Sequence, residues 1–277
     1  MTGVALSRWT MSYFVAALIS LIVAECLMVA GFGYPAAPIE APETLVLVHI
    51  VTIGWLSLLM CGALFQFVPV LIARPLYNNT LPLPTLGCLL AGLFALLLSF
   101  LQIAGIVPSH PACFVAAAAL LAAGFGLTLF NLGRTLWAAR PLPLPARFVV
   151  VALLSLGATV VLGIIFTLVL GGIATVPHLL NVTALGLPIH VIAGLGGWLT
   201  FSAIGVSYRL LAMFMLAPEL EGPTTRAAFY CGTGALGAAI LGGFAAVCAS
   251  GNVIMIVSAG GILGLAGIAC YGRDVLH

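Results

Sequence analysis

Long runs of apolar residues alternate with short polar or proline-rich segments along the whole chain. The runs cover about residues 11–31, 44–73, 85–106, 112–137, 147–172, 186–216, 226–249 and 252–273. Each run reaches the roughly 20 residues that a helix needs to cross a bilayer, and prolines mark several of the boundaries. The pattern predicts an all-α, polytopic membrane protein with eight transmembrane helices.

One of these runs occurs twice in altered form. The segment HIVTIGWLSLLMCGALFQFVP, which begins at His49, is repeated from His190, and placing Trp55 on Trp198 gives a shift of 198 − 55 = 143 residues. The same shift carries the first run onto the fifth and the third onto the seventh. We therefore expect two four-helix repeats, residues 1–140 and 141–277, in one membrane domain. An even number of helices in each repeat makes the two repeats parallel.

The basic residues are sorted to one side of the predicted spans. The eight arginines are Arg8, Arg74, Arg134, Arg140, Arg147, Arg209, Arg226 and Arg273. Under the positive-inside rule this side is cytoplasmic, so both termini are expected in the cytoplasm of a cell with a bacterial-type inner membrane. The first run has an apolar core too long for the hydrophobic region of a signal peptide, and we expect it to be a retained helix.

Composition excludes several classes of protein. The chain is 64% hydrophobic and only 5% charged, it has no lysine, and its mean hydropathy is +1.32. A net charge of +2 is too sparse for a nucleic-acid surface. The seven cysteines are an odd number, lie inside apolar runs and form no CxxC pair, which argues against a disulfide framework or a zinc site. The expected surroundings are the lipid bilayer.

Few residues could carry chemistry at membrane depth, and the main candidates are His49, His190 and Glu25. A neutral imidazole near the end of a transmembrane helix can ligate heme iron or copper, or it can bond to a loop carbonyl. Gly194 and Gly197 follow His190 at helical spacing. They could line a groove for a flat macrocycle or allow close helix packing.

Other residues of the repeated run are secondary candidates. Arg209 could pair with a heme propionate, a lipid phosphate or a neighbouring carbonyl, and Gln66 occupies the matching place in the first copy. Glu25 could relay protons or bond to an adjacent helix. The glycines of the last two runs have no histidine nearby, so we interpret them as packing residues: Gly237, Gly242, Gly260, Gly264 and Gly267.

Two of the predicted helices resemble helices of the heme-copper oxidase superfamily, which includes nitric oxide reductases. His49, followed by Gly62-Ala63 and Val68-Pro69, is similar to the second helix of the catalytic subunit, where a histidine is an axial ligand of the low-spin heme. His190, with Gly205 fifteen residues further on, resembles the tenth helix and its His-x-His motif. The resemblance implies a heme b held by His49 and His190.

The remaining site residues follow from this likeness, together with its limits. Around the heme we expect Trp55, Trp198, Gly194, Gly197 and Arg209. The second histidine of the His-x-His motif is replaced by Ile192, which is also the residue that matches His49 in the 143-residue register. No histidines correspond to the copper ligands, since His110, His178 and His277 are expected in loops or at the terminus. The likeness therefore implies no oxygen or nitric oxide reduction by this chain alone.

Three functions stay open from the sequence. The first is a heme-b membrane protein in electron transfer or redox sensing. The second is a cofactor-free scaffold that binds other respiratory-chain subunits or forms a homo-oligomer. The third, less favoured, is a permease for small molecules or metal ions, for which mid-membrane charge and broken helices are missing from the pattern.

Overall fold

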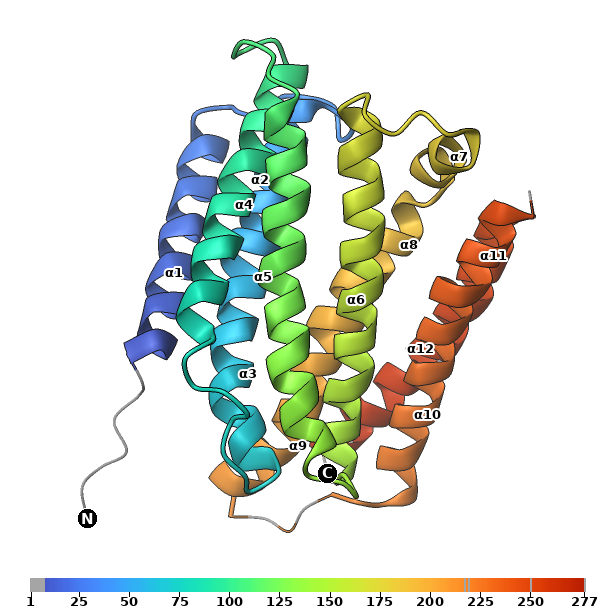
Figure 1. Ribbon diagram of the computed structural model, residues 1–277. Coiled ribbons are helices and arrows are strands. Elements are labelled where there is room, and N and C mark those ends of the chain that lie inside the picture. The colour runs from blue at the N-terminus through green and yellow to red at the C-terminus, as the bar shows by residue number, and fades with distance from the viewer. Residues whose placement is uncertain (1–7, 217, 219, 250, 277) are drawn as a thin grey trace. The chain divides into compact units, whose positions relative to one another are not determined.

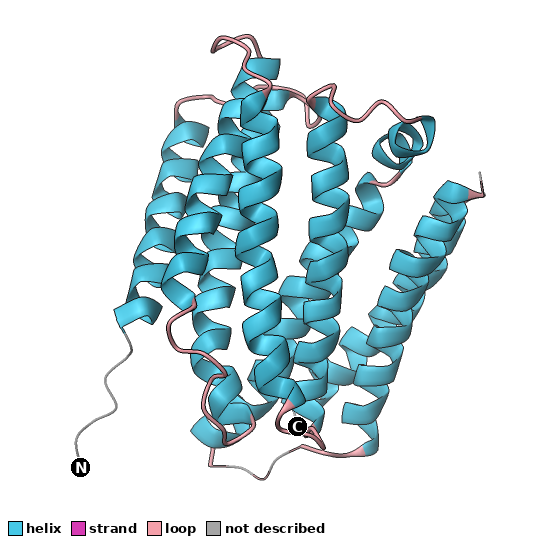
Figure 2. Cartoon of the chain, in the orientation of Figure 1, coloured by secondary structure: helices cyan, strands magenta, loops and turns pink. Residues whose placement is uncertain are grey.

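The computed structural model describes residues 8–216, 218, 220–249 and 251–276, and within these ranges the chain forms helices and no strand (Figures 1 and 2). The helices of the first half are α1 (Arg8–Val29), α2 (Pro42–His49), η1 (Ile50–Ser57), α3 (Leu58–Leu71), α4 (Pro82–Ile103) and α5 (Ala112–Trp137). Those of the second half are α6 (Leu144–Leu170), α7 (Pro177–Leu185), α8 (Leu187–Val191), η2 (Ile192–Phe201), α9 (Ser202–Phe214), α10 (Pro223–Gly237), η3 (Ala238–Gly242), α11 (Gly243–Cys248) and α12 (Val253–Leu276). The elements η1, η2 and η3 are π-helical segments.

Eight helical segments in the described residues are long and apolar enough to cross a membrane. Three of them are composite, because a π-helical segment continues the preceding α-helix without a break, as in the span Pro42–Leu71. Their bounds agree with the predicted runs to within a few residues. The chain is an all-α, multi-pass membrane protein, as the apolar pattern predicts.

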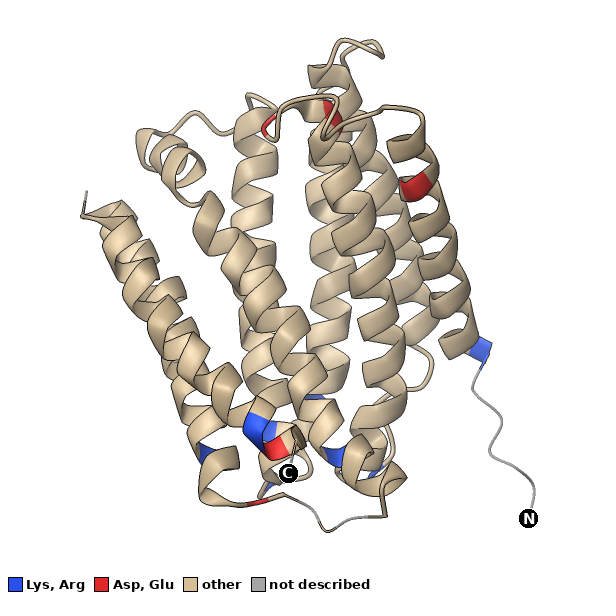
Figure 3. Cartoon of the chain, turned by 180° about the vertical axis from the view of Figure 1, so that it is seen from behind, with Lys and Arg blue, Asp and Glu red and all other residues tan. Residues whose placement is uncertain are grey.

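Charged residues lie mostly at helix ends and in connecting segments, as Figure 3 shows. Because successive spans cross in opposite directions, every arginine falls at the same side of the eight observed spans. That this side is cytoplasmic stays a prediction.

The chain divides into two compact units. The first contains Met1–Phe67, Leu76–Leu132 and Leu170–Ile173, and the second contains Val68–Pro75, Gly133–Val169 and Ala174–His277. In the first unit α1 packs on η1, and α2 packs on α4. In the second unit α10 packs along α12, and α7 packs on α11.

One helix of the second unit was not predicted. We expected a loop before the sixth span, but Pro177–Leu185 forms α7, with proline at its first helical position and Val182 buried. Val182 packs with Leu162, Ile189 and Val247 in one apolar cluster. The expectation that His178 lies in a loop is therefore wrong, because His178 lies exposed in the first turn of α7. His110 lies in a loop, as expected. His277 lies outside the described residues.

Glycines position the second span of the first unit against its neighbours. A Cβ added at Gly54 would lie 2.9 Å from Ser20 Oγ on α1 and 3.0 Å from Leu93 Cδ2 on α4. A Cβ at Gly62 would lie 2.7 Å from Tyr13 Cβ. Because such short contacts are not tolerated, both positions require glycine for α1 to approach this closely.

The second unit repeats these contacts at matching positions. A Cβ at Gly197 would overlap Ser155 on α6 and would lie 3.5 Å from Leu236 Cδ2 on α10. A Cβ at Gly205 would lie 2.8 Å from Phe148 Cβ. Each unit thus joins two of its spans through glycines at matching positions of the repeated run.

The register of the repeat is not uniform along the chain. The two glycines of the first unit and the leucine that contacts Gly54 each have a counterpart 143 positions later in the second unit (197 − 54, 205 − 62 and 236 − 93). This agrees with the predicted shift. Their partners on the first spans differ by 135 (155 − 20 and 148 − 13). The contacting residues of the first spans therefore follow an offset of 135, while the shift of 143 still carries the first span onto the fifth. Eight residues are about two helical turns, so two spans of this length still overlap broadly in either register.

Candidate functional site

His49 ends α2 and is half-buried in the first unit. Its Nδ1 lies 2.8 Å from the carbonyl oxygen of Leu45, one helical turn earlier. A carbonyl can only accept a hydrogen bond, so Nδ1 carries the proton and Nε2 carries the lone pair. The ring also packs against Phe100 of α4, with the ring centroids 5.0 Å apart. These two contacts fix both the tautomer and the orientation of the imidazole.

The π-helical segment η1 begins directly after His49. Such segments contain more residues in each turn than an α-helix does, and they are frequent at functional sites. Here the segment covers Ile50–Ser57 and includes the Gly54-Trp55 pair of the repeated run. His49 is therefore the last residue of an α-helical segment and directly precedes a π-helical one.

His190 lies in the short helix α8 of the second unit. Its ring contacts Phe166 of α6, with the centroids 5.3 Å apart. A Cβ added at Gly163 would lie 3.3 Å from His190 Cε1, so α6 gives the imidazole room by having glycine at this position. Each candidate histidine is therefore held against a phenylalanine of a neighbouring helix.

A second π-helical segment, η2, begins two residues after His190. It starts at Ile192, 142 positions after the start of η1 (192 − 50), and it ends at Phe201, 144 positions after the end of η1 (201 − 57). The repeated run is therefore repeated in its unusual helical pitch as well as in its residues. No feature of the composition predicts this pitch.

The two histidines belong to different units, His49 to the first and His190 to the second. Among the residues that the structure describes, no group of three or more His, Cys, Asp or Glu side chains is arranged to hold a metal ion. Each of the two histidines is therefore a single candidate ligand for a metal ion or a heme iron.

Of the two glycines predicted beside His190, Gly197 is required by close packing, whereas a Cβ at Gly194 would make only an ordinary contact. A Cβ at Gly194 would lie 3.4 Å from Thr159 Cγ2, and one at Gly197 would overlap Ser155, both on α6. Of the two roles that the sequence left open, close approach of helices is the one these contacts support.

The other predicted site residues have varied surroundings. Trp198 is buried, with 2% of its surface exposed, whereas Trp55 is half-buried. Arg209 is half-buried near the end of α9. Gln66 Oε1 lies 3.3 Å from the hydroxyl of Thr10, which can donate a hydrogen bond to it. Glu25 is exposed on α1.

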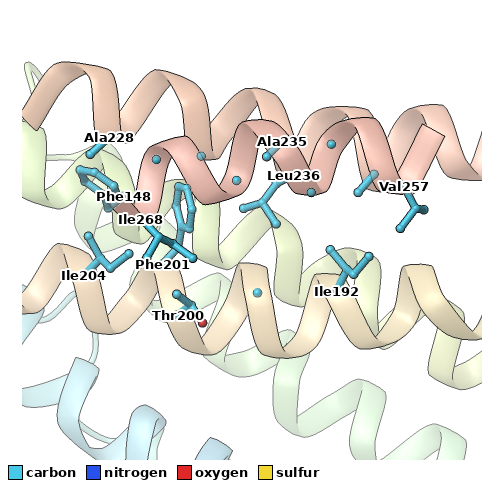
Figure 4. A pocket seen from close by; sticks show the side chains of 17 residues that line it. Phe148, Ile192, Thr200, Phe201, Ile204, Ala228, Ala235, Leu236, Val257 and Ile268 are labelled. Atoms are coloured by element: carbon cyan, nitrogen blue, oxygen red, sulfur yellow. The ribbon is translucent and has the colours of Figure 1, made fainter. Parts of the chain in front are cut away.

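The sequence interpretation missed an apolar groove in the second unit. The groove has a volume of about 200 Å³ and lies among η2, α9, α10 and α12 (Figure 4). The last two spans were expected to use their glycines for packing only, but Gly260, Gly264 and Gly267 line this groove. The same glycines also meet α10 closely, since a Cβ at Gly267 would lie 3.0 Å from the nitrogen of Gly232.

A signal for the groove is present in the repeat. In the 143-residue register, small residues of the second unit match large ones of the first. The matched pairs are Ile53 and Gly196, Leu89 and Gly232, Leu96 and Ala239, and Leu121 and Gly264. In the first unit these leucines are buried and fill the space between helices. At these four positions the second unit has the smaller side chain, whereas the lining residues Ala235 and Ile204 are larger than their matches Gly92 and Cys61.

No protein-family model matches this chain, and no curated protein is significantly similar to it.

Proposed function

We propose that this chain is a heme-b-binding membrane protein that acts in electron transfer or in heme-linked redox chemistry or sensing. His49 is the first axial ligand in this proposal, and His190 is the second candidate ligand. The observation that carries it is the hydrogen bond from His49 Nδ1 to the Leu45 carbonyl, 2.8 Å long. When bound, the heme would supply one-electron redox chemistry.

The residues present fit such a group. Histidines that ligate metals usually donate their other N–H to a carbonyl or carboxylate, and His49 has this arrangement with Nε2 as the ligating nitrogen. A heme brings four ring nitrogens of its own, so it needs only one or two axial side chains. Isolated histidines are therefore sufficient for heme, although they would be too few for a metal site made of side chains alone.

The local backbone adds support. A π-helical segment begins directly after His49, and another begins two residues after His190. A change of pitch at this point turns the residues before it relative to those after it, which is one way to aim a ligand. Arg209 lies 19 residues beyond His190 on the same span, about 28 Å at 1.5 Å per residue, so in this proposal its partner is a lipid phosphate and not a heme propionate.

The test is an absorption spectrum with a pyridine hemochrome assay on protein purified after full heme supply. The wild-type chain is expected to show a Soret band and stoichiometric heme b. The variant His49→Ala is expected to lose the heme, because it removes the preorganised ligand. The variant His190→Ala is expected to lose heme or to change its spin state.

Two further histidines provide matched controls. His110 and His178 are exposed and lie in a loop and in the first turn of α7. Their alanine variants are expected to retain all the heme. A colourless wild-type protein would contradict the proposal, and full heme in both the His49 and the His190 variants would move the ligands elsewhere.

A cofactor-free subunit of a larger membrane complex is the second candidate. In the first and last spans, Arg8–Val29 and Val253–Leu276, only 17% of an 18-residue apolar stretch is buried within the described part of the chain. Broad apolar faces of this kind suit contacts with other subunits as well as with lipid. Purification in a mild detergent tests this candidate, and a monomer without co-purifying chains would argue against it.

A further inference from the structure

The groove of the second unit lies within the membrane-spanning part of the chain. Its lining residues belong to the spans Leu187–Phe214, Pro223–Cys248 and Val253–Leu276, with Phe148 from α6. On α12 the lining runs from Val257 to Ile268, well inside the ends of the helix. A molecule that bound in this groove would therefore enter from the bilayer.

The lining offers an occupant almost no polar partner. Thr200 is its only polar side chain, and the Thr200 hydroxyl donates a hydrogen bond to the Leu195 carbonyl, 2.8 Å away. A polar ring or headgroup placed here would lose its hydrogen bonds to water without replacement. The part of the occupant inside the groove is hydrocarbon.

The groove is long and narrow. From Val257 to Ile268 it follows α12 for 11 residues, which at 1.5 Å per residue is about 16 Å. Figure 4 shows Phe148 and Ile204 at one end and Ile192 and Val257 at the other. A volume of about 200 Å³ is below the usual range for drug-sized pockets, which begins near 300 Å³. A single hydrocarbon chain suits these dimensions better than a flat macrocycle does.

Two exposed arginines lie beyond one end of the groove, where the Asp274 carboxylate is held by the Tyr208 hydroxyl. Arg226 precedes the lining residue Ala228 by two positions on α10, and Arg273 follows Ile268 by five on α12. The two helices run side by side with Gly267 against Ala228, so both arginines lie at the same end, and both are exposed. Exposed arginines at a helix end attract the phosphate groups of anionic lipids.

We propose that this groove binds one acyl chain of an anionic glycerophospholipid, whose phosphate lies at Arg226 and Arg273. In the first unit, the buried leucines Leu89, Leu96 and Leu121 occupy positions that match three small residues of this lining. The site is independent of the proposed heme, since neither candidate histidine lines it.

Native mass spectrometry of the full chain, titrated with dioleoyl phosphatidylglycerol or dioleoyl phosphatidylcholine, tests this site. Gly196→Ile restores the residue of the first repeat, and Gly261→Leu places a side chain where a Cβ has nothing within 4 Å. Each is expected to weaken binding of both lipids by about tenfold, as loss of the chain contact implies. The double variant Arg226→Ala/Arg273→Ala is expected to remove only the preference for phosphatidylglycerol.

Matched controls separate the groove from the general lipid surface. Gly237→Leu fills open space on α10 outside the groove, and Arg74→Ala removes an exposed arginine of a loop. Both are expected to bind lipid as the wild type does. Equal binding by the wild type and the groove variants would overturn the proposal. So would a dimer that is lost in Gly261→Leu, because it would assign the groove to a second copy of the chain. Heme content in the same preparations is expected to be unchanged by Gly261→Leu, so this test and that of the proposed function fail separately.

Discussion

Single glycines decide how closely the helices of each unit approach one another. Gly54 and Gly62 admit Ser20 and Tyr13 of α1 in the first unit, and matching glycines admit residues of α6 in the second. Lipid provides no hydrophobic drive between helices, so close van der Waals contact has to supply much of the association. A methyl group at such a position therefore separates two helices along their whole contact.

We expect Gly197→Ala to destabilise the protein, because the new Cβ would overlap Ser155. Overpacking of this kind costs about 1–3 kcal/mol. Thermal unfolding in detergent or nanodiscs measures the effect, with Gly237→Ala as the control since a Cβ there meets nothing within 4 Å. Equal unfolding temperatures for the two variants would show that the α6 contact is not tight.

The imidazole of His49 shows how a residue acquires a defined chemical form from its helix. The Leu45 carbonyl oxygen accepts a hydrogen bond from the Nδ1–H group, so Nδ1 keeps its proton. The sequence alone places a histidine at this depth, but it does not specify which nitrogen holds the lone pair. That choice depends on the side-chain rotamer, which the contact with Phe100 restricts.

Among the helices and loops, polar side chains form hydrogen bonds that connect a helix to a loop or to another helix. In the first unit, the buried Asn131 of α5 accepts a hydrogen bond from the Asn78 backbone nitrogen (3.0 Å) and donates one to its carbonyl (2.9 Å). In the second unit, the Tyr208 hydroxyl of α9 donates to Asp274 Oδ2 of α12 (2.9 Å). Each connection lies near one end of its helices and holds that end in register.

We expect Asn131→Leu to destabilise the first unit by about 1–3 kcal/mol, because two backbone groups of Asn78 would lose their partner. The exposed Asn79 is the control, and Asn79→Ala is expected to unfold at the wild-type temperature. The measurement is thermal or denaturant unfolding of each variant. A wild-type unfolding curve for Asn131→Leu would mean that water satisfies these groups equally well.

At the scale of the whole molecule, charge sets the orientation in the membrane. All eight arginines fall at one side of the eight spans. We expect a C-terminal green fluorescent protein fusion to fluoresce, and an alkaline phosphatase fusion between α4 and α5 to be active. These outcomes follow if the arginine side faces the cytoplasm. Active phosphatase at the C-terminus would reverse the orientation.

The apolar pattern was sufficient to predict the class of the protein and its membrane spans. In lipid every backbone polar group has to be satisfied within its own segment, so an apolar run of about 20 residues has little choice but to be helical. The proline-rich connections then place the span ends within a few residues. The shift of 143 between the two copies of the repeated run also follows from the residues, since Trp55 and Trp198 align directly.

The roles of the small residues depend on contacts between distant helices and could not be predicted from the local pattern. Gly197 and Gly264 look alike in sequence, yet one receives Ser155 of another helix and the other lines a groove. The π-helical pitch after His49, the helix α7 and the offset of 135 between the first spans were likewise not predicted. The physical reason is that each depends on which helix lies opposite, and a contact between distant segments leaves no mark in the local pattern of apolar positions.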